Sequence, residues 1–256
     1  MRRNAVHLAV LLLCALMLLG GCATVSGRQE SKGPLRVGLR PDILDFSYRN
    51  EKTGRYYGLE IDLARELARR LGCEDIEVVP VTPQTREDVL VSGEADCVIA
   101  CFSVTEDRKK RVDFSRPYYT DRLRILAERS SLIRTVRDLR GCTIAVMKGT
   151  NAMETAEEGL RQAGLLLENQ AVRMVEMSSY EDMDRALETG AVDAICMDGI
   201  MAHGYEGERI SLALKSSESE YAVATRRGSA LSKPLNEALG ALLEEGFVDQ
   251  LIKEWL

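Results

Sequence analysis

The stretch GEADCVIA, residues 93–100, returns in a related form as GAVDAICM, residues 190–197. In each copy a glycine stands three residues before an aspartate, and a run of apolar residues follows the aspartate. A glycine often ends a helix, and a short apolar run is typical of a buried strand. The repetition therefore predicts two similar α/β lobes, each with polar residues at the carboxyl end of a buried strand.

Strands and helices alternate around the first copy. Apolar runs predict strands at residues 35–39, 76–81 and 96–101. The sequence GLEIDLARELARRLG places four leucines on one face, which predicts an amphipathic helix that ends at Gly72. The sequence TREDVLVSG is expected to begin a second helix, with Thr85 and Asp88 as a capping box.

The alternation begins again in the second half of the chain. Strands are predicted at residues 142–147, 171–177 and 193–197, and helices at residues 152–163 and 180–187. Strands that alternate with helices indicate an α/β protein with a largely parallel sheet. A last helix, which contains four leucines at residues 235, 239, 242 and 243, is expected to pack back on the first lobe.

This order of elements predicts that the chain crosses twice between the lobes. Lobe 1 is expected to contain residues 34–126 plus 222–256, and lobe 2 residues 127–221. The crossings are expected near residues 124–129 and 217–225. Two crossings form a hinge, so a ligand held at facing strand ends would be enclosed when the lobes close.

The N-terminus predicts export. Two arginines precede an apolar run that is short for a membrane-spanning helix, so residues 1–21 are expected to be a signal peptide. Residues 19–22, Leu-Gly-Gly-Cys, resemble a bacterial lipobox, which implies cleavage before Cys22 and lipidation of its thiol. A plain secretory signal is the alternative. Residues 22–33 are small and polar, as expected of a tether, and the predicted location is the extracytoplasmic face of the cell membrane.

Length and charge limit the possible functions. Removal of the signal leaves 256 − 21 = 235 residues, enough for one large or two medium domains. The signal contributes two positive charges, so the net charge of −6 becomes −6 − 2 = −8. This negative balance argues against nucleic acid as a partner.

The cysteine content argues against a disulfide framework and against a metal. Five cysteines remain after Cys22, an odd number, and several lie in or beside apolar runs, which favours buried free thiols. On a strand, Cys97 and Cys101 would lie about 13 Å apart. The chain has two histidines, so no ligand set for structural zinc is evident. We expect neither a metal nor a cofactor.

The segment SVTEDRKKRVDFSRPYY, residues 103–119, crowds five cations into an acidic protein. Thr105 is predicted to cap a short helix with an acidic first turn. Arg108 then lies one turn into the helix, just beyond the strand that ends at Cys101. From there its guanidinium can bind a carboxylate with two N–H groups. A surface ion pair with Asp113 is the alternative. The other cations of the turn are expected to face water: Lys109, Lys110 and Arg111.

Four stretches resemble a known family, the solute-binding proteins of polar amino acid ABC transporters (family 3). They are GLEIDLARELARRLG, SGEADCVIACFSVTEDRKKRVDFSRPYYTD, LRGCTIAVMKGTN and GAVDAICMD, and together they span almost all of the chain after the tether. The resemblance implies the type II periplasmic-binding fold. In that α/β fold each of two lobes is a mostly parallel sheet flanked by helices, and two hinge crossings join the lobes.

The resemblance also implies site residues. Arg108 would bind the α-carboxylate of the ligand, Ser103 would assist through its hydroxyl and backbone N–H, and Asp198 would bind the α-ammonium. The turn in the second lobe would add contacts through Thr150 and Asn151. A buried zwitterion needs such partners, because each unpaired buried charge costs several kcal/mol. On the residues alone, Ser103 and Asp198 could equally be turn formers.

Side-chain specificity is suggested by two more arginines. The sequence VTPQTRED resembles the branch that binds aspartate and glutamate, in which Arg86 would face the ligand, and Arg40 is a basic residue of the kind often found there. The alternatives are an exposed helix residue for Arg86 and a solvated loop charge for Arg40. The chain departs from the family pattern at Cys101, where that branch usually has a hydroxyl, at Ile43, where many members have an aromatic residue, and at Asn151.

The function implied is that of a monomeric, lipid-anchored receptor that closes on an acidic amino acid and passes it to an ABC permease without chemical change. No catalytic residue is expected. One alternative is an enzyme like the secreted cyclohexadienyl dehydratases, which share the fold and would need a general acid in the cleft. His203 is the one histidine after the signal peptide, and it lies beyond a strand end. The other is an amino-acid sensor that acts through a separate signalling protein.

Overall fold

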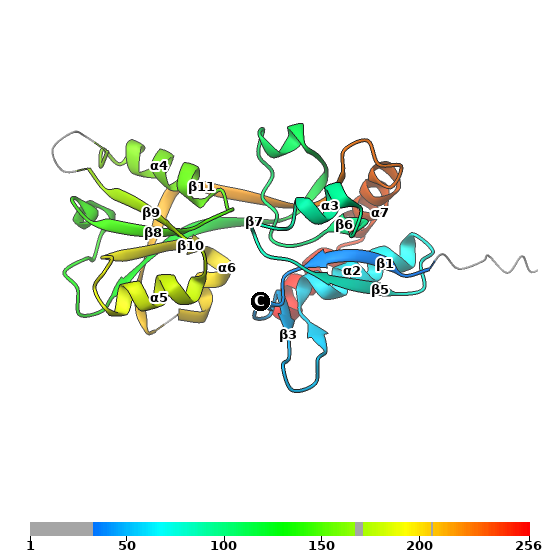
Figure 1. Cartoon of the computed structure of the whole chain (residues 1–256), viewed down its shortest axis with the longest axis horizontal. Coiled ribbons are helices and arrows are strands. Elements are labelled where there is room, and N and C mark those ends of the chain that lie inside the picture. Colours follow the sequence, from blue (N-terminus) through cyan, green and yellow to red (C-terminus); the bar gives the residue numbers. More distant parts are fainter. Residues whose placement is uncertain (1–32, 167–170, 206) are drawn as a thin grey trace, which may run out of the picture. The chain divides into compact units, whose positions relative to one another are not determined.

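The structure is a computed structural model that describes residues 33–166, 171–205 and 207–256. Its elements are, in chain order, β1 (Leu35–Leu39), β2 (Asp42–Ile43), β3 (Ser47–Arg49), β4 (Tyr56–Tyr57), α2 (Leu59–Arg70), β5 (Ile76–Pro80), α3 (Asp88–Ser92), β6 (Cys97–Val98), η1 (Arg108–Lys110), β7 (Val112–Glu128), η2 (Val136–Leu139), β8 (Thr143–Met147), α4 (Ala152–Gln162), β9 (Arg173–Met177), α5 (Tyr180–Glu188), β10 (Ala194–Asp198), α6 (Gly199–Ala202), η3 (His203–Tyr205), β11 (Arg209–Arg226), α7 (Ser232–Glu244) and α8 (Phe247–Trp255). They are shown in Figure 1.

The predicted signal peptide and the lipidated Cys22 lie outside the described residues, as does most of the predicted tether. These remain predictions. Within the part of the chain that the structure describes, no helix combines the length and the apolar character that a membrane crossing requires.

Eight strands form one sheet in the order β5-β1-β6-β11-β7-β10-β8-β9. The strands at each end of this order are parallel, β5 with β1 and β6 on one side and β10 with β8 and β9 on the other. In the middle, β7 and β11 are antiparallel to each other and to their outer neighbours. The sheet therefore contains two parallel halves of the kind predicted, and two antiparallel strands join them.

The joining strands β7 and β11 are unusually long, with 17 and 18 residues. They run side by side through both halves of the sheet (Figure 1), and their register is interrupted between Ala213 and Glu218. The division of the chain into two lobes remains a proposal. The pairing of Leu123 and Leu126 with β10 favours a crossing of β7 a few residues before the predicted one.

The first half of the sheet packs against α2, α7 and α8. The leucines Leu59, Leu63 and Leu67 form the apolar face of α2 and are fully buried, as the spacing predicts. Leu235 and Leu239 of α7 join the same core. The C-terminal helices therefore return to the first half, as expected.

The second half is covered by helices on both faces. Ile144 and Val146 of β8 pack in the core that contains α4, whereas Ala145 and Met147 pack in the core that contains α5. Successive side chains of a strand point to opposite faces of the sheet, so α4 and α5 lie on opposite faces. Figure 1 shows the two helices on either side of β8 and β10.

Two local predictions were wrong. The third strand was predicted over residues 96–101 but β6 is limited to Cys97–Val98, because the chain leaves the sheet and Cys101 takes a positive φ of 46°. The predicted capping box also fails. The Thr85 hydroxyl accepts a hydrogen bond from the Thr82 amide at 3.0 Å, and α3 begins only at Asp88.

The cysteines follow the prediction of free thiols. Cys97, Cys101 and Cys196 are buried, and Cys73 and Cys142 are partly buried; none of these five forms a disulfide in the described part of the chain. Burial raises the pKa of the Cys142 thiol, and the nearby Asp193 and Asp138 act in the same direction, so the thiol is held neutral.

Candidate ligand-binding site

Polar side chains gather where several strands of both halves end. Arg40 follows β1, Ser103 follows β6, and Asp198 is the last residue of β10. Thr150 and Asn151 follow β8. All five residues come from carboxyl ends of strands, the position at which open α/β sheets bind ligands.

Arg108 faces this region and is 6% exposed. Its Nη1 donates to the Ser103 carbonyl at 2.9 Å and its Nη2 to the Gly149 carbonyl at 3.2 Å. Its guanidinium lies 4.9 Å from the centroid of the Phe102 ring. Burial lowers the pKa of Arg108, although Glu87 and other acids oppose this effect. The carboxylate nearest to Arg108 is that of Glu87, 3.8 Å from Nε.

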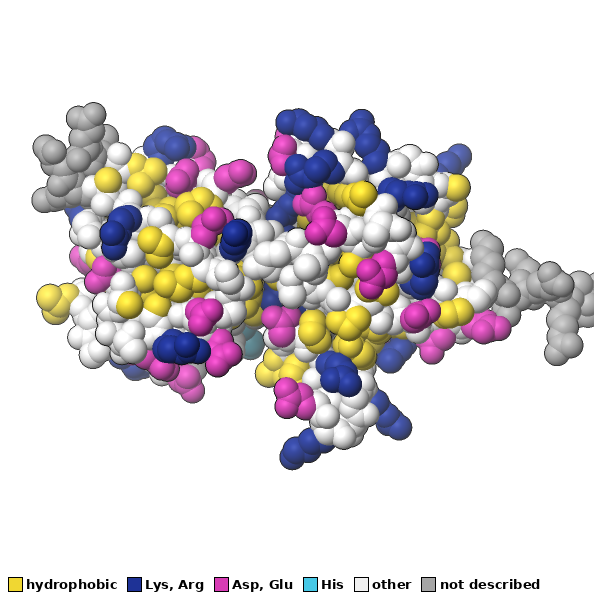
Figure 2. Space-filling model, viewed as in Figure 1, with side chains coloured by type: hydrophobic (Ala, Val, Ile, Leu, Met, Phe, Trp, Pro, Cys, Tyr) yellow, Lys and Arg dark blue, Asp and Glu magenta, His cyan; other side chains and the backbone are white. Residues whose placement is uncertain are grey.

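The alternative reading of Arg108 as a surface charge paired with Asp113 is not what the structure shows. The Asp113 carboxylate accepts hydrogen bonds from the Gly228 amide and the Ser232 hydroxyl instead. The neighbouring cations Lys109, Lys110 and Arg111 are exposed, as predicted, and pair with acids at the surface. Figure 2 shows Lys and Arg side chains gathered at the edge of this half. The Thr105 hydroxyl accepts a hydrogen bond from the Arg108 amide at 3.2 Å, but the predicted helix is shorter than expected, because η1 begins only at Arg108 and Asp107 holds its N-cap position.

Arg86 is 2% exposed, so it is not the exposed helix residue of the alternative reading. Its Nη1 donates to the carbonyls of Ala100 and Cys101 at 2.9 and 3.2 Å. Its Nε is buried and donates to no described residue, and no described ion pair includes Arg86. Burial lowers the pKa of Arg86 to about 9, and the like charges of Arg108 and Arg40 add to the effect.

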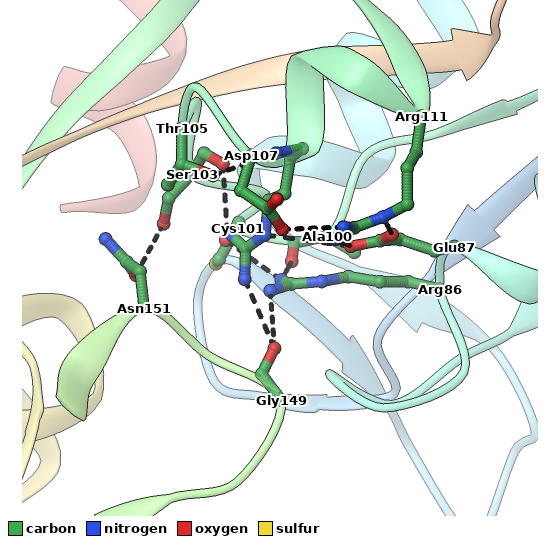
Figure 3. Close-up of polar contacts among 11 residues, drawn as sticks. Arg86, Glu87, Ala100, Cys101, Ser103, Thr105, Asp107, Arg111, Gly149 and Asn151 are labelled. Atoms are coloured by element: carbon green, nitrogen blue, oxygen red, sulfur yellow. Dashed lines mark hydrogen bonds and ion pairs between the residues drawn. The ribbon is translucent and has the colours of Figure 1, made fainter. Parts of the chain in front are cut away.

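The two guanidiniums converge on one backbone oxygen. Arg86 Nη2 and Arg108 Nη2 each donate to the Gly149 carbonyl at 3.2 Å, and Figure 3 draws dashed lines that meet at this oxygen. Gly149 has a φ of +79°, and a Cβ there would lie 3.0 Å from the carbonyl of Pro83. A glycine is therefore required for this turn to approach both arginines so closely.

A second link between the halves runs through Asn151. Its Oδ1 accepts a hydrogen bond from the Ser103 hydroxyl at 3.0 Å (Figure 3). Its Nδ2 donates to the Ser219 hydroxyl at 3.1 Å. The Thr150 hydroxyl, by contrast, serves its own turn: it donates to the Met147 carbonyl at 2.7 Å and accepts from the Ala152 amide. Ser103 and Asn151 are thus brought together across the site.

Arg40 is 1% exposed and is not a solvated loop charge. It donates two hydrogen bonds to the Asp42 carboxylate, at 2.9 and 2.7 Å. Its guanidinium lies 5.3 Å from the centroid of the Tyr180 ring, which comes from α5. Arg40 therefore has a protein carboxylate as its partner, whereas Arg86 has none among the described residues.

Asp198 supplies the negative charge expected at the site. Burial and, to a smaller extent, the neighbouring Asp121 carboxylate raise its pKa to about 6, while Arg40 opposes the change. Asp121 accepts hydrogen bonds from the Tyr221 hydroxyl and the Ile200 amide. The raised pKa indicates a carboxylate that a ligand cation would stabilise.

Sequence reasoning missed the acids and aromatic rings that surround these residues. Glu60, on α2, is fully buried beside Cys101, and its carboxylate accepts the Cys101 amide at 2.7 Å. A signal for it exists, because Glu60 interrupts the run of apolar residues at the start of α2. Phe102 and Tyr180, which contact the arginines, had no such signal. Ile43, noted as a departure from the family, is a core residue.

A pocket of about 460 Å³ opens beside this cluster. It is lined by Arg108, Thr150 and Asn151 from the predicted site and by acids that include Glu87 and Glu154. A larger pocket of about 600 Å³ lies along β7 and α6, and its lining includes Asp121 and Gly199, which neighbour the predicted residue Asp198. No group of three His, Cys, Asp or Glu side chains is placed to hold a metal ion within residues 33–166, 171–205 and 207–256.

Comparison with known proteins identifies the family. The model of the bacterial extracellular solute-binding proteins, family 3, matches residues 35–256. The chain belongs to this family. It is 28% identical to the ABC transporter glutamine-binding protein GlnH of Bacillus subtilis (strain 168), with 97% of this chain and 96% of that protein covered. It is 30% identical to the L-cystine-binding protein TcyJ of Escherichia coli (strain K12), with 88% and 84% covered.

The family 3 assignment agrees with solved structures. An ancestral arginine-binding protein bound to arginine superposes with a TM-score of 0.74 at 28% identity, over 88% of this chain and 99% of that chain. The two-lobed type II periplasmic-binding fold predicted from the sequence is confirmed. These three relatives are named for three different amino acids, so membership of the family does not identify the ligand of this chain. The charges of the site are the remaining guide to the ligand.

Proposed function

We propose that this protein binds an acidic amino acid between its two lobes and delivers it to an ABC permease without changing it chemically. The observation that supports the acidic ligand is the pair Arg86 and Arg108. Both guanidiniums are buried, and both donate to a neutral carbonyl oxygen, that of Gly149. A ligand carboxylate at that position would form charge-assisted hydrogen bonds, which are roughly twice as strong as neutral ones.

The division of roles that we propose is the one that the resemblance to the family implies. Arg108, with the Ser103 backbone and hydroxyl nearby, binds the α-carboxylate, and Arg86 binds the side-chain carboxylate. Asp198 binds the α-ammonium, whose charge restores the pKa of that carboxylate toward its ordinary value. The amide of the same length would leave Arg86 without an anion, so glutamine is expected to bind more weakly than glutamate.

Closure and anchoring complete the proposal. The turn at Gly149 to Asn151 already contacts Arg86, Arg108 and Ser103, so a ligand held by the arginines would be enclosed from the second lobe. The Leu-Gly-Gly-Cys sequence at residues 19–22 supports a lipid anchor at Cys22 on the extracytoplasmic face of the membrane. We propose the lobes as residues 34–126 plus 222–256 and residues 127–221.

A screen of the twenty amino acids by thermal shift tests the ligand. At a concentration one hundred times the dissociation constant, a ligand stabilises the folded protein by about 2.7 kcal/mol. We expect glutamate or aspartate to give the largest shift at pH 7.5. Stabilisation by basic or aromatic amino acids alone would refute the acidic assignment, and turnover of prephenate by the purified protein would refute binding without chemistry.

A pair of variants on one turn tests the site. Arg108→Met is expected to reduce ligand affinity at least a hundred-fold, because it leaves the α-carboxylate buried without its cation. Lys109→Met removes the same charge from an exposed neighbour that pairs only with Glu106 among the described contacts, and is expected to bind as the wild type does. Calorimetric titration of both variants is the measurement, and undiminished binding by Arg108→Met would place the ligand elsewhere.

A further inference from the structure

Glu60 is an acid in an apolar position. It lies on α2 between Leu59 and Ile61, all three of them fully buried. Its Oε1 accepts hydrogen bonds from the Cys101 amide at 2.7 Å and from the Tyr118 hydroxyl. Its Oε2 is buried as well and accepts no hydrogen bond from the described residues. Burial of a carboxylate with one oxygen unpaired reduces the stability of the folded protein, which suggests that Glu60 has a function.

The hydrogen bonds of Glu60 lead to the arginines of the site. Cys101 holds a positive φ of 46°, which residues other than glycine adopt only when their surroundings impose it. The Cys101 amide is bound by Glu60, and the carbonyls of Ala100 and Cys101 are bound by Arg86 Nη1. Glu60 therefore fixes the backbone segment on which the Arg86 guanidinium rests.

The charge of Glu60 acts on the same site. The groups that face it are the Tyr118 hydroxyl, Cys101 and the Arg40 guanidinium. Burial raises the pKa of Glu60 to about 6, while hydrogen bonds from Tyr118 and Cys101, together with Arg40, oppose this rise. At pH 7.5 Glu60 is thus an anion, and at pH 5.0 it is mostly neutral.

We propose that Glu60 determines the specificity of the amino-acid site: it positions Arg86 through Cys101, and its negative charge limits how much further negative charge the ligand can bring. This inference rests on the proposed function, since it concerns the same binding site. Removal of the charge with the shape retained should favour ligands that carry an extra carboxylate. Removal of the hydrogen bonds as well should weaken every ligand that Arg86 contacts.

Two substitutions separate these effects. Glu60→Gln keeps an oxygen for the Cys101 amide and the Tyr118 hydroxyl but removes the charge, whereas Glu60→Ala removes both. Glu94→Gln is the matched control, because it removes the same charge from an exposed residue of the same half. Calorimetric titrations with L-glutamate and L-glutamine at pH 7.5 and pH 5.0 give the affinity ratio of the two ligands. Protonation of Asp198 in this range changes the ratio as well, because Asp198 interacts with Arg86. The difference between Glu60→Gln and the wild type at each pH therefore isolates the contribution of Glu60.

We expect Glu60→Gln to raise the ratio of glutamate to glutamine affinity roughly ten-fold at pH 7.5, as removal of a nearby buried charge allows, and to leave it unchanged at pH 5.0. In the wild type the ratio should change near the pKa of Glu60. In Tyr118→Phe this change should occur at a higher pH, because the Tyr118 hydroxyl stabilises the Glu60 carboxylate. Glu60→Ala should bind both ligands more weakly than the wild type, whereas Glu60→Gln, which keeps the hydrogen bonds, should not show this loss of affinity. Glu94→Gln should match the wild type.

The outcomes distinguish this inference from the proposed function. If the wild type binds another amino acid instead of glutamate, the proposed ligand is wrong, and the same ratio is measured with that amino acid and an isostere of different charge. If the wild type binds but Glu60→Gln leaves the ratio unchanged at pH 7.5, or if Glu60→Ala binds like the wild type, the role of Glu60 is refuted. If no amino acid binds, the proposed function and the proposed role of Glu60 are both refuted.

Discussion

Single residues of the site keep their charges in surroundings that disfavour them. Arg86 has its pKa lowered to about 9, and Asp198 has its pKa raised to about 6, in both cases chiefly by burial. The two lie near enough for each to reduce the shift of the other. A bound zwitterion would supply the missing opposite charge to each of them, so the same burial that costs stability in the free protein favours the ligand.

This cost gives a prediction for Asp198→Asn. Because the pKa of Asp198 is raised in the folded state, its contribution to stability is fully present below its ordinary pKa near 3.8 and is lost as the pH rises through about 6. As the pH rises over this range, the free energy of unfolding of the variant should therefore increase relative to that of the wild type. At pH 7.5 it should be larger by about 2–3 kcal/mol. Urea denaturation from pH 4 to pH 7.5 measures the difference.

The same variant should lose ligand affinity, since the α-ammonium loses its anion. Asp75→Asn, at an exposed position, is the control and should change neither quantity. An Asp198→Asn protein that is less stable than the wild type at pH 7.5, or that binds the ligand equally well, would contradict the assignment of Asp198.

At the scale of elements, the start of α2 depends on one glycine. Gly58 has a φ of 121°, and a Cβ there would lie 2.5 Å from the carbonyl carbon and oxygen of Phe46. The carbonyls of Asp45 and Phe46 accept the first amides of α2, those of Leu59 and Glu60. The loop before the helix thus caps it by backbone bonds, and Glu60 is placed by the same contact.

Gly58→Ala is expected to destabilise the protein by about 3 kcal/mol or more, because the new methyl group meets rigid backbone. Gly72→Ala at the other end of α2 is the control. Gly72 also has a positive φ, of 75°, but a Cβ there meets nothing within 4 Å, so only the backbone strain of about 1–2 kcal/mol applies. Equal losses for the two variants in chemical denaturation would show that the contact with Phe46 is not tight.

Across the whole molecule, β7 and β11 make the two halves of the sheet one hydrogen-bonded unit. Both strands are continuous through the halves, and each half adds its own core on either side of them. Contacts between the halves at Asn151 and Gly149 lie at the candidate site. The two halves are therefore expected to unfold together, and a ligand held between them should stabilise both.

The single tryptophan allows a test of this cooperativity. Trp255 belongs to α8 in the first half, where its indole N–H donates to Asp62 at 3.1 Å. Its fluorescence reports on that half, whereas far-ultraviolet circular dichroism reports on the whole chain. We expect the two unfolding transitions to coincide and to shift equally when the ligand is added. If ligand shifts the transition followed by circular dichroism but not the one followed by fluorescence, the two halves unfold separately.

The sequence by itself determined the features that depend on local pattern. Periodicity identified α2, α4 and α5 with their buried faces, because a helix repeats its contacts every three to four residues. The contact of the Arg108 amide with the Thr105 hydroxyl was also predictable, since the two residues lie close together in the chain. Arg86 and Arg40 were named as candidates, and the structure places both in the same buried cluster.

Only the tertiary structure decided how those residues are paired. The Gly149 carbonyl that Arg86 contacts is 63 residues away in the chain, and the Glu60 carboxylate that holds the Cys101 amide is 41 residues away. The length of β7 was equally hidden, because Pro117 and scattered charges break the alternation, and the strand is completed by pairing with β11 across an irregular register. Burial and charge at a site are sums over neighbours that the fold brings together, so pKa shifts and partners follow from packing and not from local pattern.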